Sequence, residues 1–215
     1  MKDNKTNVRI IVADDHGIVR MGLIQTIQRL RPDAIISEVE DFKSLYKVIL
    51  KEELDLAIMD VNMPNGSVQE AIDYIKMHRP QLKILIFSSQ DEELYAKRYL
   101  KMGAGGYLSK QSSTAVIETA LTAMLNTGRY ASDDVKEAMF LESLKGPTKS
   151  KPLESLSDRE LQIANKLAEG IPLKELSNQL NLHSSTISTY KNRLSEKLKI
   201  RSIPELVEIL RLYSH

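Results

Sequence analysis

The sequence VRIIVADD (residues 8–15) joins a short apolar run to two adjacent carboxylates. The run has the length and the branched side chains of a buried strand. Four more apolar runs of strand length follow along the chain, and segments of helical periodicity separate them. Parallel strands need helical crossovers and are apolar where both faces are covered. The alternation therefore predicts an α/β fold with a five-stranded parallel, doubly wound sheet of the flavodoxin-like type.

The expected elements alternate regularly as far as residue 127. Strands are predicted over residues 8–13, 34–39, 54–59, 83–87 and 106–108. Helices are predicted over residues 17–30, 42–51, 68–78, 92–102, 114–126 and 133–144. The strand pattern does not return afterwards, so the remaining chain is expected to be helical.

The chain length of 215 residues is enough for two domains. We expect the first domain to span residues 1–128, a helical segment and linker to span 129–152, and a small all-α domain to span 153–215. Residues 145–151 (KGPTKSK) are typical of an exposed linker, because they combine three lysines with glycine and proline.

The all-α domain is expected to open with a capping box. Ser157 is the predicted cap, and Glu160 reaches back to it from three residues further on. Three more helices are predicted, over residues 173–180, 184–197 and 203–212.

Composition excludes several kinds of protein. The chain has no cysteine, which rules out disulfides and thiolate metal sites and suits a reducing cytoplasm. We expect neither export nor a membrane span, because the N-terminus is polar and no later stretch approaches the roughly 20 apolar residues of a spanning helix. The net charge is only +1, but residues 183–201 carry five Lys or Arg against one acid. That local excess is where a phosphate backbone could bind.

Polar side chains follow the predicted strands at the edge where a doubly wound sheet binds its ligands. Asp14 and Asp15 come directly after the first strand, and Asp60 follows the third. Three crowded carboxylates repel one another unless a cation or protons intervene, and oxygen ligands favour Mg²⁺. Ser88 follows the fourth run and Lys110 follows the fifth, and such hydroxyl and ammonium groups can hold a transferred phosphoryl group.

Three motifs resemble the receiver domain of a response regulator of the NarL/FixJ type. They are VADDHGIVRMGL (residues 12–23), MDVNMP (59–64) and GAGGYLSK (103–110). The resemblance implies that Asp60 is the phosphoacceptor, that Lys110 binds the phosphoryl group, and that Ser88 and Tyr107 are its hydroxyl and aromatic switches. The implied Mg²⁺ ligands are Asp14, Asp15, Asp60 and the backbone carbonyl of Asn62.

Two positions depart from the usual receiver pattern. The loop after Pro64 is short, since Asn65-Gly66-Ser67 leads almost at once to a helix, and Gln111 stands where many receivers have proline. Neither change removes a catalytic group. His16 is expected to be a polar surface or packing residue without a catalytic role.

The C-terminal part resembles a LuxR-type helix-turn-helix. The motifs LSDRE (residues 156–160), LAEG (167–170), KELS (174–177) and TISTYKNRLSEKL (186–198) carry the resemblance, which covers nearly all of residues 153–212. The last motif is most similar to the BvgA/EvgA branch. The expected DNA-binding residues are Lys174, Thr186, Ser188, Thr189, Lys191, Asn192 and Arg193. Ser, Thr and Asn can read base edges, whereas Lys and Arg hold phosphates.

The combined pattern predicts a two-component response regulator that binds promoter DNA, not an enzyme. The implied partners are a sensor histidine kinase, double-stranded promoter DNA, a second copy of the chain in a homodimer and, as a further candidate, RNA polymerase. Two alternatives stay open. One is a regulator that works without phosphorylation. The other is an aspartate-nucleophile phosphohydrolase, which would need a second acid where Asn62 stands.

Overall fold

The structure is a computed structural model that describes residues 7–144 and 152–213. The chain divides into two compact units, Met1–Glu142 and Ser143–His215. The predicted linker, residues 145–151, lies outside the described residues, and the predicted domain limits at residues 128 and 153 stay a prediction.

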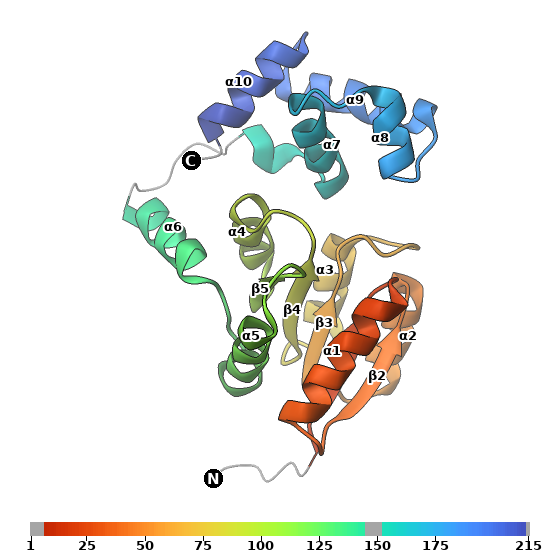
Figure 1. The fold of residues 1–215 in the computed structure, drawn as a ribbon, viewed down its shortest axis with the longest axis vertical. Helices are drawn as coiled ribbons and strands as arrows, with labels where there is room; N and C mark the ends of the chain where they lie inside the picture. The colour runs from red at the N-terminus through yellow and green to blue at the C-terminus, as the bar shows by residue number, and fades with distance from the viewer. Residues whose placement is uncertain (1–6, 145–151, 214–215) are drawn as a thin grey trace. The chain divides into compact units, whose positions relative to one another are not determined.

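The first unit is built on a five-stranded parallel sheet (Figure 1). The strands are β1 (Arg9–Ala13), β2 (Ile35–Val39), β3 (Leu56–Met59), β4 (Lys83–Ser88) and β5 (Gly106–Ser109). Their order is β2-β1-β3-β4-β5, and every neighbouring pair is parallel. This order confirms the predicted doubly wound, flavodoxin-like fold, and each strand limit lies within two residues of its prediction.

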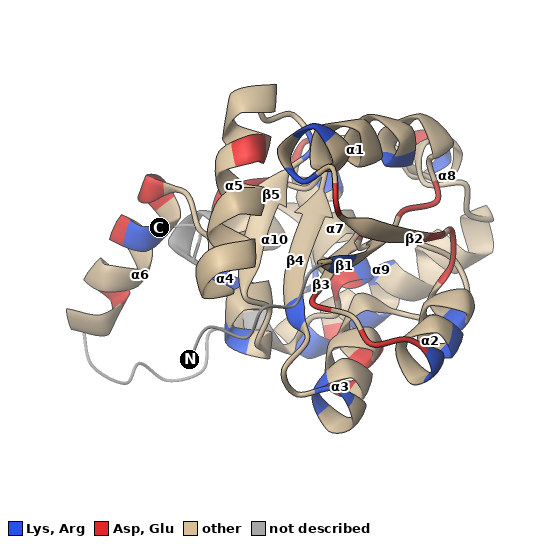
Figure 2. Ribbon diagram, turned by 90° about the horizontal axis from the view of Figure 1, so that it is seen from below, with Lys and Arg blue, Asp and Glu red and all other residues tan. Residues whose placement is uncertain are grey.

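Helices cover both faces of the sheet (Figure 2). They are α1 (Gly17–Leu30), α2 (Phe42–Lys51), α3 (Val68–His78), α4 (Glu92–Met102), α5 (Thr114–Thr127) and, beyond the sheet, α6 (Asp133–Leu144). Helices α1 and α5 lie on one face, where Ile10, Ile27 and Leu121 are part of one buried cluster. Helices α2, α3 and α4 lie on the other face. The three inner strands, β1, β3 and β4, are buried almost throughout, which accounts for their continuous apolar sequence.

Polar caps explain why the predicted helix starts are accurate. Four helices of the first unit begin after a residue whose side chain accepts a hydrogen bond from a backbone N–H three residues on. The four caps are Asp41, Ser67, Asp91 and Ser113. Among the described residues, no helix combines the length and the apolar character needed to cross a bilayer.

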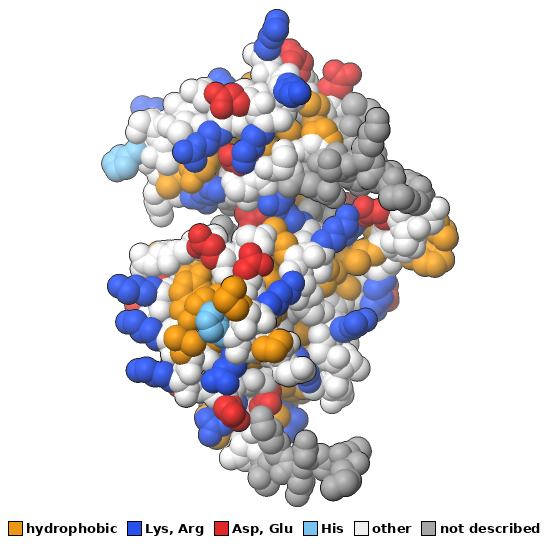
Figure 3. Space-filling view, turned by 180° about the vertical axis from the view of Figure 1, so that it is seen from behind, with side chains coloured by type: hydrophobic (Ala, Val, Ile, Leu, Met, Phe, Trp, Pro, Cys, Tyr) orange, Lys and Arg blue, Asp and Glu red, His pale blue; other side chains and the backbone are white. Residues whose placement is uncertain are grey.

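The outward side of α2 and α3 carries apolar and aromatic side chains (Figure 3). Leu50 is 54% exposed and Met77 is 78% exposed. The ring of Tyr74 lies 4.7 Å from that of Tyr46 and stacks on His78 with centroids 4.1 Å apart. These contacts tie the two helices together at their surface.

The short loop before α3 is held by close packing. Ser67 caps α3, so the helix starts at Val68, four residues after Pro64, as the sequence predicts. Gly66 lies against the buried ring of Phe42, and a Cβ at this glycine would be 2.7 Å from the Cβ of Phe42. The backbone therefore has no space for a side chain here.

Replacing Gly66 with alanine should destabilise the first unit by about 1–3 kcal/mol, because Phe42 or the loop must move to admit the methyl group. The matched control is Gly22→Ala in the exposed middle of α1, where an added Cβ meets nothing within 4 Å. That change should stabilise the protein by about 0.5–1 kcal/mol. Urea unfolding measures both. Equal midpoints for the two variants would show that the loop yields freely.

The second unit is helical throughout its described residues. It contains a short 3-10 turn (Pro152–Ser155) and the helices α7 (Asp158–Ala168), α8 (Leu173–Gln179), α9 (Ser184–Leu198) and α10 (Ile203–Tyr213). The predicted capping box is present, with Ser157 as cap and Glu160 reaching back. The core side of these helices is fully buried at Leu176, Ile187 and Leu206. On α10, Leu206 and Leu210 belong to the core.

Candidate metal centre and nucleic-acid interface

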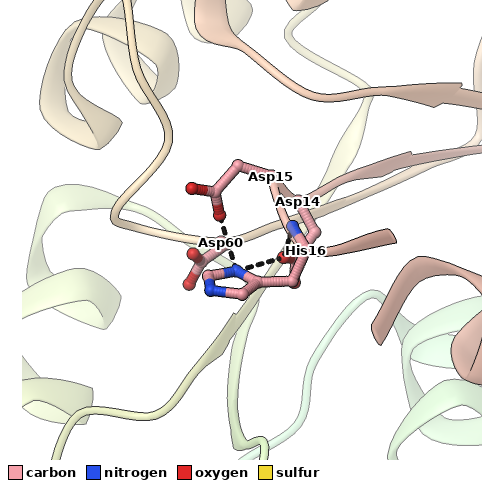
Figure 4. A group of neighbouring side chains, drawn as sticks. All are labelled: Asp14, Asp15, His16 and Asp60. Atoms are coloured by element: carbon pink, nitrogen blue, oxygen red, sulfur yellow. Dashed lines mark hydrogen bonds and ion pairs between the residues drawn. The ribbon is translucent and has the colours of Figure 1, made fainter. Parts of the chain in front are cut away.

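Four side chains meet beyond the carboxyl ends of β1 and β3 (Figure 4). Asp14, Asp15 and His16 follow β1, and Asp60 follows β3. The two strands are neighbours, and the Asp60 N–H donates to the Ala13 carbonyl at 2.8 Å. One donor atom from each of the four side chains lies within 4.8 Å of the others. Parallel strand order thus assembles the acidic cluster that the sequence predicts.

Lys110 joins the cluster from the end of β5, which is separated from β3 by β4. Its backbone N–H donates to the Ser88 carbonyl at 2.8 Å, which places it at the end of β5. Its Nζ lies 2.7 Å from Asp14 Oδ2 and 3.3 Å from Asp60 Oδ1. The ammonium therefore lies against two carboxylates and partly offsets their repulsion.

The two buried carboxylates still have unused hydrogen-bonding capacity. Asp14 Oδ2 and Asp60 Oδ1 both pair with the Lys110 ammonium, and a carboxylate oxygen can accept more than one such contact. Burial raises the pKa of the Asp60 carboxyl, Lys110 lowers it less, and the charge of Asp14 raises it further. A divalent cation would stabilise the ionised form of Asp60 against burial and against the charge of Asp14, because it supplies positive charge and coordinates carboxylate oxygens. The acidic cluster is typical of a Mg²⁺ site.

Ser88 and Tyr107 lie inside the molecule. Ser88 ends β4, is fully buried, and its Oγ accepts a hydrogen bond from the Gln90 N–H at 3.2 Å. Tyr107 on β5 is equally buried, and its hydroxyl donates to the Gln90 carbonyl at 2.8 Å. Burial raises the pKa of Tyr107, and a hydrogen bond with Ser88 opposes the rise. Both predicted switch residues therefore contact the same backbone segment after β4.

Sequence reasoning missed the second tyrosine at this segment. Tyr99 on α4 donates from its hydroxyl to Gln90 Oε1 at 3.0 Å, and its ring stacks on that of Tyr107 with centroids 6.0 Å apart. Gln90 is thus held by two tyrosines from different elements. The sequence around Gln90 gives no signal for these two contacts, because Gln90 is a polar residue in a loop.

The remaining two predictions concern Asn62 and His16, whose side chains are exposed to solvent. Asn62 follows Asp60 by two residues, and its side chain is exposed in the loop between β3 and α3. The side chain of His16 is 64% exposed, but its Nδ1 lies 2.7 Å from Asp15 Oδ1 and 3.2 Å from Asp14 Oδ1. Sequence reasoning gave His16 no role at the site, whereas its ring is part of the cluster.

The predicted DNA-binding residues lie on α8 and α9. Five of them are exposed and two, Thr186 and Lys191, are half-buried; the exposed ones are Lys174, Ser188, Thr189, Asn192 and Arg193. The hydroxyls of Ser188 and Thr189 donate to backbone carbonyls one turn earlier, at 3.0 Å each. Their hydroxyls can therefore offer acceptor lone pairs outwards without breaking the helix.

An ion pair fixes α9 against the start of α7. Glu160 is buried, and its Oε2 accepts from Lys197 Nζ at 2.6 Å, from the Ser157 N–H at 2.7 Å and from the Ser157 hydroxyl at 2.9 Å. Burial alone would raise the pKa of Glu160, but these hydrogen bonds outweigh it and the net pKa is lowered. Lys197, which belongs to the predicted basic run, therefore has a structural partner.

Comparisons with known proteins agree with both units. Residues 10–122 match the response regulator receiver domain family, and residues 154–210 match the luxR family of bacterial regulatory proteins. The chain is 28% identical to response regulator UvrY of Escherichia coli (strain K12), over 94% of this chain and 93% of that one. It is also 28% identical to response regulator GacA of Pseudomonas aeruginosa, over 93% of each.

Solved structures of RcsB from Salmonella resemble the whole chain. One, of the RcsB response regulator of Salmonella typhimurium, has a TM-score of 0.59 at 25% identity and covers 95% of this chain and 100% of that one. Another, described as bound to promoter rprA in the presence of phosphomimetic BeF3-, has a TM-score of 0.60 at 26% identity and covers 95% and 98%. The chain therefore belongs to the response regulator family: it is a two-component response regulator of the NarL/FixJ kind, a transcription regulator and not an enzyme, with a receiver domain followed by a LuxR-type DNA-binding domain.

Proposed function

We propose that Asp60 accepts a phosphoryl group from a sensor histidine kinase and that this modification controls promoter binding. The observation that carries the proposal is the meeting of Asp14, Asp15, Asp60 and the Lys110 ammonium at one edge of the sheet. Mg²⁺ would be held by Asp14, Asp15, Asp60 and the carbonyl of Asn62. When bound, the ion neutralises charge on the phosphoryl oxygens.

Phosphoryl transfer needs positioning and charge neutralisation more than covalent chemistry from the protein. A carboxylate oxygen of Asp60 attacks phosphorus, the new O–P bond forms as the P–N bond to the kinase histidine breaks, and the released imidazole takes up a proton. Lys110 already lies 3.3 Å from the attacking carboxylate, so its ammonium can pair with the phosphoryl oxygens without a large movement. Transfer then places a doubly charged group in the receiver domain.

The switch acts on the segment after β4. Ser88 is proposed to hydrogen-bond the new phosphoryl oxygens, and Tyr107 to repack in response. Since Gln90 bonds both of them, movement at Ser88 is transmitted directly to the tyrosine. The modification shifts a two-state equilibrium only by its unequal stabilisation of the two states. We propose that the favoured state is a homodimer that binds DNA.

The DNA-binding half is proposed to read double-stranded promoter DNA with α9 in the major groove. In a dimer, two such helices reach half-sites about one helical turn apart. The proposed contacts are Lys174, Thr186, Ser188, Thr189, Lys191, Asn192 and Arg193. The related RcsB protein is described as bound to promoter rprA, which supports promoter DNA as the ligand of this half. We further propose RNA polymerase as a partner, a cytoplasmic location, and a recognition helix that resembles the BvgA/EvgA branch.

Alanine replacements of Lys174 and Arg193 should weaken promoter binding at all sequences alike. Each proposed phosphate contact that is lost should reduce the slope of log affinity against log salt by about 1. Lys43→Ala is the matched control, since this exposed lysine lies on α2 of the receiver domain. Fluorescence anisotropy across a salt series gives the slopes. If both variants keep the native slope, α8 and α9 do not form the phosphate-binding face.

Genome-wide footprinting with and without beryllofluoride tests the whole proposal, because this mimic occupies the phosphoryl position. We expect protected promoter sites that gain occupancy when the mimic is present. Unchanged occupancy would instead favour a regulator that works without phosphorylation and would leave only the DNA-binding role. The phosphohydrolase alternative has no support, since the chain matches regulators and position 62 is asparagine.

A further inference from the structure

We propose that His16 is a nitrogen ligand of the metal centre and makes the centre prefer divalent transition metals, such as Mn²⁺ and Ni²⁺, over Mg²⁺. The inference rests on the proposed function, because it concerns the cation that assists phosphorylation of Asp60. It assigns a role to a residue that the acidic cluster alone does not require. The metal class follows from the chemistry of an imidazole among carboxylates.

The ring of His16 lies where a ligand of a shared ion would lie (Figure 4). Its Nδ1 is 2.7 Å from Asp15 Oδ1 and 3.2 Å from Asp14 Oδ1. Neighbouring donors on an octahedral ion with bonds of about 2.1 Å are separated by about 3 Å. The nitrogen therefore lies about as far from each of the two oxygens as one ligand of an ion lies from its neighbours.

The cluster has separate sides for the ammonium and for the ring. Asp14 Oδ2 and Asp60 Oδ1 lie against Lys110. Asp14 Oδ1 and Asp15 Oδ1 lie against His16 instead. The ammonium and the ring therefore contact different oxygens of Asp14, so neither displaces the other.

The backbone at His16 directs its ring toward the carboxylates of the cluster. His16 stands at the cap position of α1, but its side chain makes no capping hydrogen bond to the helix. Its backbone N–H donates to Asp14 Oδ1 at 2.9 Å, so the peptide and the ring approach the same carboxylate. Imidazole binds Mn²⁺, Co²⁺, Ni²⁺ and Zn²⁺ better than Mg²⁺, which keeps to oxygen ligands. His16 thus adds affinity selectively for the transition metals.

Calorimetric titration of the full chain with MgCl₂ and with NiCl₂ tests the selectivity. In His16→Ala the dissociation constant for Ni²⁺ should rise roughly tenfold or more, whereas that for Mg²⁺ should change less than about threefold. His78→Ala is the matched control, because His78 lies on α3 with its ring stacked on Tyr74, and both constants should keep their native values. Equal weakening of Mg²⁺ and Ni²⁺ in His16→Ala would overturn the proposal.

Pulsed electron paramagnetic resonance of bound Mn²⁺ tests the bond itself. The native protein should show echo modulation from a directly bound imidazole nitrogen, and His16→Ala should lack it. Bound Mn²⁺ without nitrogen modulation in the native protein would overturn the ligand role, even if Mg²⁺ still supports labelling of Asp60. Conversely, nitrogen modulation in a protein that never labels at Asp60 would support the ligand and contradict the proposed function.

Discussion

Replacing Asp60 with asparagine should abolish phosphoryl labelling and make promoter affinity independent of beryllofluoride. The amide keeps the shape of the side chain but cannot attack phosphorus or share a cation with Asp14 and Asp15. In the native protein the mimic should raise promoter affinity by about 5- to 150-fold, the usual range of coupling between two sites. In the variant the ratio of the two affinities should be close to one. Fluorescence anisotropy with a labelled promoter measures both.

The matched control for this experiment is Asp73→Asn. Asp73 is exposed on α3, outside the acidic cluster, and its carboxylate accepts a hydrogen bond from Gln69. This variant should respond to beryllofluoride like the native protein. If Asp60→Asn keeps a native response to the mimic, or keeps signal-dependent promoter control in cells, phosphorylation of this residue is not the switch.

Asp60→Asn should also raise the stability of the metal-free protein near neutral pH. Burial raises the pKa of Asp60, so the folded state disfavours its ionised form. The free energy of unfolding is therefore largest below the ordinary pKa of an aspartate carboxyl. It falls as the pH rises from that value through the raised pKa of Asp60. Asparagine does not ionise, so the variant does not lose this stability. The free energies of unfolding of the native protein and the variant should therefore differ more at pH 7 than at pH 3. Thermal unfolding in a chelator measures the difference. A variant that is less stable at pH 7 would contradict the argument.

Replacing Glu160 with alanine should cause the largest loss of stability in the DNA-binding half, about 2–4 kcal/mol. The change removes the capping box of α7 and leaves Lys197 without its partner. Glu160→Gln keeps the size of the side chain and should cost less, since its amide oxygen can still accept from Ser157. Because the pKa of Glu160 is lowered, its contribution is present above the ordinary pKa of glutamate and is lost as the pH falls through the lowered value.

Urea unfolding followed by circular dichroism at several pH values measures this effect in the full chain. Glu208→Gln is the matched control, since Glu208 is exposed on α10, and it should change stability by less than about 0.5 kcal/mol. The difference between native protein and Glu160→Ala should shrink below the lowered pKa, where Glu160 is protonated in both states. A difference that stays constant from pH 7 to pH 3 would show that the ion pair contributes nothing.

The fold and the acidic cluster could be predicted because both depend on local signals and simple topology. Apolar runs identify parallel strands, and caps such as Asp41 and Ser67 fix where helices start. Once β1 and β3 are neighbours, residues that follow them must meet, so Asp14 and Asp60 are placed together by strand order alone. Lys110 follows from the same reasoning applied to β5.

The contacts that sequence reasoning missed depend on where individual side chains point and pack. Tyr99 reaches Gln90 because α4 packs on β5, and nothing in either residue's neighbourhood in the sequence indicates that contact. Lys197 lies 37 positions from Glu160 and was counted only as part of a basic run. His16 was expected to be a polar surface or packing residue because it follows two acids at a helix start, and its contact with Asp15 depends on the direction of its ring.

The central claim is that the acidic cluster and Lys110 form a cation-assisted phosphoacceptor at Asp60. Mass spectrometry of the full chain after incubation with acetyl phosphate tests it most directly, with parallel samples in Mg²⁺ and in chelator. The account predicts the mass of one added phosphoryl group, located on the peptide that contains Asp60, in the Mg²⁺ sample alone. A phosphoryl group on a different residue, equal labelling in chelator, or no labelling at all would contradict it.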